Sequence, residues 1–242
     1  MDISKPQYFL VVAVVIIVCG VCMSATLMNF LVETDKSLML ALTFRRHTCL
    51  DMFWYHYSRL STWLPLVAVL LATIWVRHGG GNRQKIYLFV AIAMLVLVLD
   101  QTSSGLIKPL VERLRPSHDE TINGSLQFVN GYRGGRYGFV SGHATNIVGI
   151  TTWLWFMFRT RMARLLFLFF AATLCYSRVY LGVHFPGDIV CGALLGFLIA
   201  RFSILLLQKY NIMFTTGKEP WPVLGTYLLT VAALLAVTFL EY

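Results

Sequence analysis

The chain has 242 residues, of which 57% are hydrophobic and only 13% are charged. Soluble domains carry about a quarter charged residues, so this composition excludes an ordinary soluble fold and favours an integral membrane protein. The formal net charge of +9 does not indicate a nucleic-acid-binding protein. The basic residues lie in short loops beside apolar runs, where such residues set topology and contact lipid headgroups.

Seven apolar runs are candidate membrane spans of about 20 residues. They cover residues 8–32, 62–77, 86–107, 141–158, 164–180, 186–207 and 221–240. The first run has no A-x-A-like cleavage site, so we expect an uncleaved anchor. The segment between the first two runs mixes aromatic residues with Arg45, Arg46 and Arg59, which is typical of a helix lying in the membrane interface. We therefore expect an all-α, polytopic helical bundle that forms one membrane domain over residues 1–242.

Basic residues of the short loops predict the orientation of these spans. If seven spans alternate, one face collects Lys5, Arg77, Arg83, Lys85, Arg159, Arg161, Arg164, Arg201, Lys209 and Lys218. That face should be cytoplasmic, with the N-terminus inside and the C-terminus outside. The loop 108–140 and the turn around His184 would then lie together on the opposite side of the membrane.

Three polar segments reach this opposite side. The first, "KPLVERLRP", places Lys108 and Arg115 seven residues apart, about two helical turns, so they could share a helix face unless the helix restarts at Pro109. The second, "SGHA" at 141–144, opens the fourth span. The third, "SRVYLGVHFPGD" at 177–188, crosses the turn between the fifth and sixth spans.

The cations and the helix start in these segments suit a phosphate ester. Catalysis of phosphoryl transfer is mostly positioning and electrostatics, so the phosphate oxygens need cations and N–H donors. We expect phosphate binding by Lys108, Arg115 and Arg178. The start of the fourth span would add N–H groups, the hydroxyl of Ser141 and close approach at Gly142.

Two histidines remain for the two chemical roles. His184 is the better candidate nucleophile, because Asp188 in the first turn of the sixth span could orient its imidazole. His143 would then act as the general acid. The sequence has no acidic cluster or His/Cys spacing typical of a metal site, so we expect no metal and no cofactor.

Together these segments resemble the three signature motifs of the type 2 phosphatidic acid phosphatase superfamily, over residues 108–188. That superfamily includes membrane lipid phosphatases and soluble vanadium haloperoxidases. The resemblance implies a six-span catalytic core at about 60–207, a phosphohistidine intermediate and no required metal; the span 221–240 would be an addition. Val140 stands where the family usually has proline.

Other polar or small residues have weaker interpretations. Arg133 and Arg136 could contact a headgroup, although an ordinary solvated loop explains them equally well. Asp100 is a charge within a span, where support for Lys108 or a hydrogen bond inside the bundle is favoured over catalysis. Gly192 and Gly196 form a G-x-x-x-G pattern typical of close helix packing.

We therefore expect a membrane lipid phosphatase that resembles bacterial members of the family. It should lie in the inner membrane, with its site facing the periplasm or the exterior. Candidate substrates are a polyprenyl diphosphate, phosphatidylglycerol phosphate, phosphatidic acid and a lipid A phosphate, and the sequence does not rank them. The alternatives are a lipid-to-lipid phosphotransferase and a non-catalytic lipid-binding protein. A vanadate-dependent peroxidase is disfavoured because those relatives are soluble. The expected partners are the phosphorylated lipid and the bilayer, with no nucleic acid and the oligomeric state open.

Overall fold

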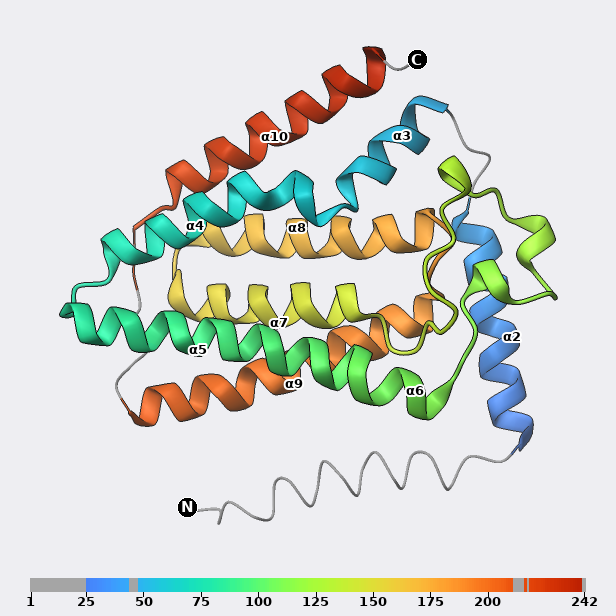
Figure 1. Cartoon of the computed structure of the whole chain (residues 1–242), viewed down its shortest axis with the longest axis horizontal. Helices are drawn as coiled ribbons and strands as arrows, with labels where there is room; N and C mark the ends of the chain where they lie inside the picture. Colours follow the sequence, from blue (N-terminus) through green and yellow to red (C-terminus); the bar gives the residue numbers. More distant parts are fainter. Residues whose placement is uncertain (1–24, 44–47, 211–215, 217, 241–242) are drawn as a thin grey trace.

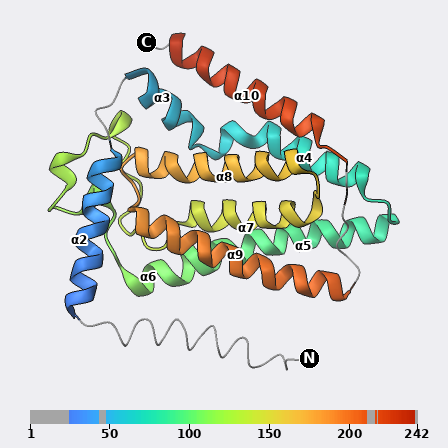
Figure 2. The same cartoon turned by 180° about the vertical axis from the view of Figure 1, so that it is seen from behind.

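The computed structural model describes residues 25–43, 48–210, 216 and 218–240. Most of these residues form helices that lie alongside one another in a bundle, as Figures 1 and 2 show from opposite sides. The bundle helices are α4 (Leu64–Arg77), α5 (Asn82–Asp100), α7 (Gly142–Met157), α8 (Arg161–Tyr180), α9 (Pro186–Lys209) and α10 (Trp221–Leu240). The predicted all-α membrane architecture is therefore confirmed.

Five helices in the described part of the chain are long and apolar enough to cross a membrane. They are Leu60–Arg77, Asn82–Val111, Arg161–Tyr180, Pro186–Lys209 and Trp221–Leu240. Each corresponds to one of the predicted spans. The predicted span 141–158 is present as α7, but α7 has only 16 residues. It packs against α5, α8 and α9, and nine of its residues are buried, so protein surrounds much of this helix.

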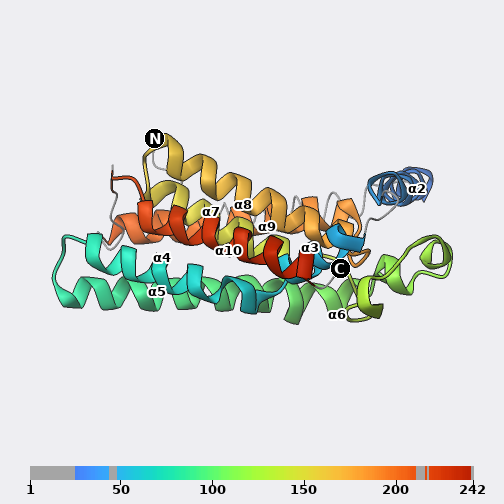
Figure 3. The ribbon, with the colours of Figure 1, turned by 90° about the horizontal axis from the view of Figure 1, so that it is seen from above.

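The predicted first span, 8–32, lies mostly outside the described residues. Its last residues open α2 (Ala25–Leu42), which continues without a break past residue 32. Helix α2 runs across one end of the bundle, whereas the bundle helices run along its length (Figures 1 and 3). Glu33, Asp35 and Lys36 in its middle make a membrane crossing by α2 itself costly. The predicted first span and its end at residue 32 stay a prediction.

Two short helices, α3 and α6, lie near the segments that carry the predicted site residues. Helix α3 (Thr48–Tyr57) packs against α8 and α10, and a 3₁₀ turn (Leu60–Trp63) leads from it into α4. At the end of α5, a π-helical segment (Gln101–Ile107) continues into α6 (Lys108–Val111). The loop up to α7 contains three further 3₁₀ turns, Pro116–His118, Asn123–Ser125 and Val129–Gly131.

Lys108 and Arg115 do not share a helix face, so that prediction is wrong. The helix ends at Val111 because Glu112 adopts a left-handed conformation with a φ of 51°. Arg115 lies in extended backbone, and its N–H donates to the carbonyl of Arg136 at 3.0 Å. The helix also does not restart at Pro109. A proline ring clashes with the preceding turn of an α-helix, and here the preceding turn is the wider π-helix, a feature common at functional sites.

Helices α7 and α9 lie in close contact because glycines line their interface, which confirms the predicted G-x-x-x-G packing. A Cβ at Gly192 would lie 2.6 Å from the carbonyl oxygen of Ser141. A Cβ at Gly196 would overlap the carbonyl of Thr145 and lie 3.0 Å from the backbone nitrogen of Gly149. Small residues therefore let the two backbones touch.

The connections divide between the two ends of the bundle as alternation of the spans predicts. The α4–α5 turn, the α7–α8 turn and the start of α10 lie at one end, and they carry most of the basic loop residues (Figure 1). The loop before α7, the α8–α9 turn and helix α2 lie at the other end. All three motif segments therefore meet at the end away from the basic turns.

Replacing Gly196 with alanine should lower the free energy of unfolding by about 1–3 kcal/mol, because the new methyl group meets backbone atoms that cannot move aside. Thermal or denaturant unfolding in detergent measures this change. The matched control is Gly225→Ala on α10, where no atom lies within 4 Å of the added carbon. Equal stability of the two variants would contradict a role for this contact.

Candidate active site

Five elements bring the motif residues to one end of the bundle. Lys108 opens α6, Ser141 caps α7, and Arg178 lies in the last turn of α8. His184 lies in the turn between α8 and α9, and Asp188 in the first turn of α9. The backbone N–H of Ser141 donates to the carbonyl of Asp188 at 3.0 Å, which joins the beginnings of α7 and α9.

Arg115 reaches His184 from the loop before α7. Its Nη1 atom lies 3.0 Å from Nε2 of His184 and donates to the carbonyl of Val183 at 3.1 Å, while its Nε donates to the carbonyl of Tyr137 at 3.1 Å. Gly134, with a φ of +67°, passes so close that a Cβ there would lie 3.0 Å from Nη1. The guanidinium therefore lies against the imidazole, and Arg115 is only 8% exposed.

His184 and Asp188 are buried together. Nδ1 of His184 lies 3.5 Å from Oδ2 of Asp188 without forming a hydrogen bond to any described residue. Catalytic hydrogen bonds are often long in unliganded sites and shorten when substrate binds. Burial lowers the pKa of His184 well below its ordinary 6.5, and the cations of Arg115, Arg178 and Lys108 lower it further. The imidazole is therefore neutral near pH 7, as a nucleophile requires.

Asp188 is also held by Arg113 and, through it, by Asp35, and no sequence motif indicated either residue. Nη1 of Arg113 donates to Oδ1 of Asp188 at 2.9 Å, and Nη2 donates to Oδ2 of Asp35 at 2.7 Å. Asp35 lies on α2, and its Oδ1 accepts the N–H of Gly187 at 2.7 Å. A carboxylate amid the apolar residues of α2 was the available signal, because such a charge usually needs a specific partner.

Arg178 is held by two residues that no sequence motif indicated. Nη1 donates to the hydroxyl of Ser58, and Nη2 donates to the hydroxyl of Tyr132 at 3.1 Å. Arg178 is 2% exposed, and its Nε has no hydrogen-bond partner among the residues that the structure describes. A buried cation with a free donor is suited to an anionic ligand.

The start of α7 contacts Lys108 closely. The Nζ of Lys108 donates to the hydroxyl of Ser104 at 3.4 Å, and a Cβ at Gly142 would lie 3.6 Å from that Nζ and 2.8 Å from that hydroxyl. Ser141 is fully buried, and its Oγ accepts the N–H of Ala144 at 3.4 Å as the cap of α7. Its contact with phosphate stays a prediction.

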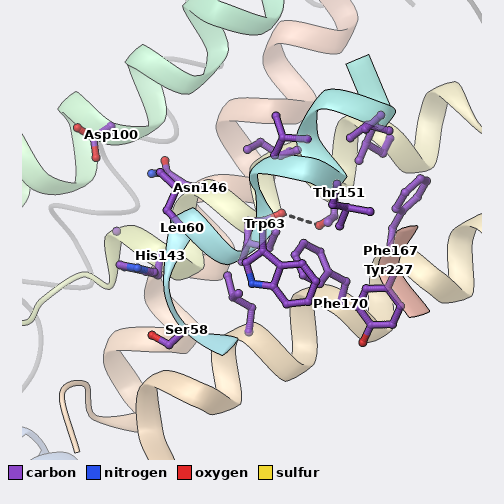
Figure 4. Close-up of a pocket in the computed structure, with 18 of the residues that line it drawn as sticks. Ser58, Leu60, Trp63, Asp100, His143, Asn146, Thr151, Phe167, Phe170 and Tyr227 are labelled. Atoms are coloured by element: carbon purple, nitrogen blue, oxygen red, sulfur yellow. Dashed lines mark hydrogen bonds between the residues drawn. The ribbon is translucent and has the colours of Figure 1, made fainter. Parts of the chain in front are cut away.

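A cavity of about 440 Å³ runs from these residues into the bundle. Its polar end is lined by Asp100, Ser104, Lys108, Arg115, Gly142, His143 and Asn146. Its deeper wall is apolar and aromatic, with Trp63, Phe167, Phe170 and Tyr227 beyond the polar group in Figure 4. Ligand sites of 300–1,000 Å³ with a few convergent polar groups are typical of small molecules and lipids. This cavity therefore fits an amphiphile.

A second, polar pocket of about 340 Å³ opens beside the first and is lined by Tyr55, Ser58, Arg59, Tyr132 and Arg178. His143 lines both spaces and is exposed to them. It therefore lies where a polar compartment meets an apolar one.

Arg133 and Arg136 lie apart from both spaces. Each side chain is exposed, and their guanidinium carbons lie 4.8 Å from the ring centre of Phe128 and 5.7 Å from that of Tyr137, respectively. Their contact with a headgroup stays a prediction. The described residues also contain no group of three or more His, Cys, Asp or Glu side chains that could hold a metal ion.

Comparisons with known proteins agree with this arrangement. The profile of the PAP2 superfamily, the type 2 phosphatidic acid phosphatases, matches residues 85–212. A lipid A 4'-phosphatase of Porphyromonas gingivalis is 33% identical over 72% of this chain and 73% of its own length. A lipid A 4'-phosphatase of Bacteroides thetaiotaomicron is 36% identical over 70% of this chain and 75% of its own length.

A solved structure shares the fold. The PAP2-type phosphatidylglycerolphosphate phosphatase of Bacillus subtilis matches with a TM-score of 0.57 and 20% identity, over 84% of this chain and 96% of that one. The superfamily profile covers more than half of the sequence and includes all eight residues that the motifs predicted. The chain therefore belongs to the PAP2 superfamily, within its membrane lipid phosphatases.

Proposed function

We propose that this protein hydrolyses a phosphate ester of lipid A through a phosphohistidine intermediate, at the extracytoplasmic face of a bacterial inner membrane. The observation that supports this reaction is that four of the eight motif residues line the polar head of a cavity whose depth is apolar, namely Lys108, Arg115, Gly142 and His143. A fifth, Arg178, lines the adjoining polar pocket. The two relatives named lipid A 4'-phosphatase favour lipid A over the other phosphorylated lipids.

The phosphate would first meet the cations at the cavity head. Lys108 and Arg115 line the cavity, and Arg178 lines the adjoining polar pocket, so a phosphate near His143 could contact all three. His184 does not line the cavity, because Arg115 lies against its Nε2 atom. Binding of phosphate oxygens to Arg115 would draw the guanidinium away and leave Nε2 free to attack.

In the first step, the Nε2 lone pair of His184 attacks phosphorus and the bond from phosphorus to the ester oxygen breaks. His143 gives a proton to that oxygen, so the dephosphorylated lipid leaves as an alcohol. Asp188 stabilises the positive charge that forms on His184. In the second step, His143 takes a proton from water, the oxygen attacks phosphorus, and the N–P bond breaks. Inorganic phosphate leaves and the neutral imidazole returns.

The orientation follows from the division of charge between the two ends. The turns rich in Lys and Arg lie at the end opposite the catalytic residues, and basic turns usually face the cytoplasm. The proposed site therefore faces the periplasm. The described fold also accommodates the predicted core at 60–207 and the added span 221–240 within the same bundle, and we propose that they act as one domain.

The proposed activity is tested by phosphate release from the purified protein in detergent with EDTA. The panel is lipid A, a polyprenyl diphosphate, phosphatidylglycerol phosphate and phosphatidic acid. We expect release from lipid A at the highest kcat/KM, and loss of at least about 1,000-fold in kcat for His184→Ala. Full activity of this variant would contradict the assigned nucleophile, and no release from any lipid would contradict a hydrolase.

The imidazole of His184 should have a pKa below the ordinary histidine value, because burial and nearby cations favour its neutral form. A pH titration of the ¹⁵N-labelled histidine rings by NMR, with the signal assigned through His184→Gln, measures this value. We expect the ring to be mostly neutral at pH 6.5, where an ordinary imidazole is half protonated. A pKa at or above 6.5 would mean that the imidazole is not desolvated as described.

The apolar depth of the cavity should bind a hydrocarbon chain. Ile150 lines it two turns along α7 from His143, so Ile150→Trp should fill the space without touching the catalytic end. We expect KM for the lipid to rise at least about tenfold, the loss of roughly two buried methylenes, with hydrolysis of p-nitrophenyl phosphate unchanged. Leu229→Trp, at a position 72% exposed on α10, is the matched control. An unaltered KM in Ile150→Trp would show that the hydrocarbon chain of the lipid does not bind in this cavity.

A further inference from the structure

Two residues that the motif analysis assigned no role connect α2 to the proposed catalytic pair: Arg113, within the first motif segment, and Asp35, on α2. Asp188 divides its oxygens between two sets of partners: Oδ2 faces His184 and accepts the N–H of Phe185 at 3.1 Å, whereas Oδ1 accepts a hydrogen bond from Arg113 at 2.9 Å. Arg113 in turn binds Asp35 at 2.7 Å. The carboxylate of Asp188 is therefore held on the side away from the imidazole.

A buried carboxylate needs this support. The side chain of Asp188 has no exposed surface, and an ionised group in that environment is costly without a cation. Neutral His184 supplies no charge, and Arg115 is directed at His184 and at two carbonyls. Among the described residues, Arg113 is the only cation within 4 Å of Asp188 that is not a histidine.

Specific contacts also fix the position of Asp35 against the first turn of α9. Its carboxylate is 11% exposed and accepts the N–H of Gly187, in the first turn of α9, at 2.7 Å. A Cβ at Gly187 would lie 2.6 Å from Oδ2 of Asp35, so the residue between Pro186 and Asp188 must be small for α2 to dock. The guanidinium of Arg113 also lies 4.3 Å from the ring centre of Phe185. Backbone, charge and ring contacts therefore fix one geometry.

We propose that Arg113 and Asp35 are positioning residues that hold Asp188 toward His184, which makes α2 a functional part of the catalytic site. This inference rests on the proposed function, because it needs a charge to develop on His184. Two carboxylates and one guanidinium carry a net charge of −1, which matches the +1 that His184 gains during attack. Without Asp35, the guanidinium of Arg113 would neutralise Asp188 and weaken its pull on the imidazole.

The test measures kcat and KM for the preferred lipid in Asp35→Asn, Arg113→Gln and Arg113→Lys. We expect kcat to fall by roughly 10- to 100-fold in Asp35→Asn and Arg113→Gln, a range typical of residues that orient a catalytic ligand. KM should stay within about twofold, because neither residue lines the cavity. Arg113→Lys should recover part of kcat, and the double variant Asp35→Asn/Arg113→Gln should be no worse than Arg113→Gln alone.

Matched controls lie on the same helix. Glu33 is 72% exposed, and Lys36 pairs with Glu33 and Asp119 rather than with the catalytic network, so Glu33→Gln and Lys36→Gln should keep the wild-type kcat. The methyl group of Gly187→Ala would displace the carboxylate of Asp35 from its contact with α9. This variant should therefore lower kcat as Asp35→Asn does.

The outcomes separate this inference from the proposed function. Wild-type activity in Asp35→Asn and Arg113→Gln, with His184→Ala inactive, would overturn the inference and leave the function standing. A fall in kcat that is accompanied by a rise in KM and a fall in thermal stability of similar size would show a merely structural role. That result would also overturn the inference. No phosphate release by the wild-type protein would overturn the proposed function and the inference together.

Discussion

The backbone contact between α7 and α9 is the constraint on which the rest of the site depends. Glycines let the two helices touch, and the N–H of Ser141 binds the carbonyl of Asp188 at the point where both helices begin. This contact fixes the distance between the segment that carries His143 and the segment that carries His184 and Asp188. Larger residues at the interface would separate the two histidines, although neither would be altered itself. The proposed chemistry therefore depends on small residues where α7 and α9 touch.

Three cations gather at the end of an apolar bundle, and they repel one another. They stay there because neutral groups hold each one: carbonyls of Val183 and Tyr137 for Arg115, hydroxyls of Ser58 and Tyr132 for Arg178, and the hydroxyl of Ser104 for Lys108. None of these partners is a carboxylate, so the positive charge remains available to an anion. A phosphate dianion would relieve the repulsion and replace lost hydration, which is the preorganisation expected of a phosphoryl-transfer site.

The sequence predicted the helical membrane fold, the G-x-x-x-G contact and the convergence of the three motifs, because apolar run length and alternation of spans determine which segments share an end. The sequence-based prediction failed where the local backbone conformation decides which residues lie on the same helix. The seven-residue spacing allowed Lys108 and Arg115 to share a helix face, but the left-handed Glu112 ends that helix, and Arg115 lies in an extended loop segment instead. Arg113, Asp35, Ser58 and Tyr132 were missed because their roles come from contacts between residues distant in sequence. Such contacts leave no spacing pattern.

The position of His143 between two unlike compartments has a consequence for how the products of the proposed reaction leave the site. The apolar cavity extends into the bundle, whereas the polar pocket beside it is lined by Arg59, Tyr132 and Arg178. The two products of the proposed hydrolysis differ in the same way, since the dephosphorylated lipid is apolar and inorganic phosphate is a small hydrated anion. Each can leave through the compartment that resembles it, so departure of the lipid need not wait for departure of the anion. A rise in free phosphate would then slow turnover by occupying the cation cluster without competing for the hydrocarbon-binding space.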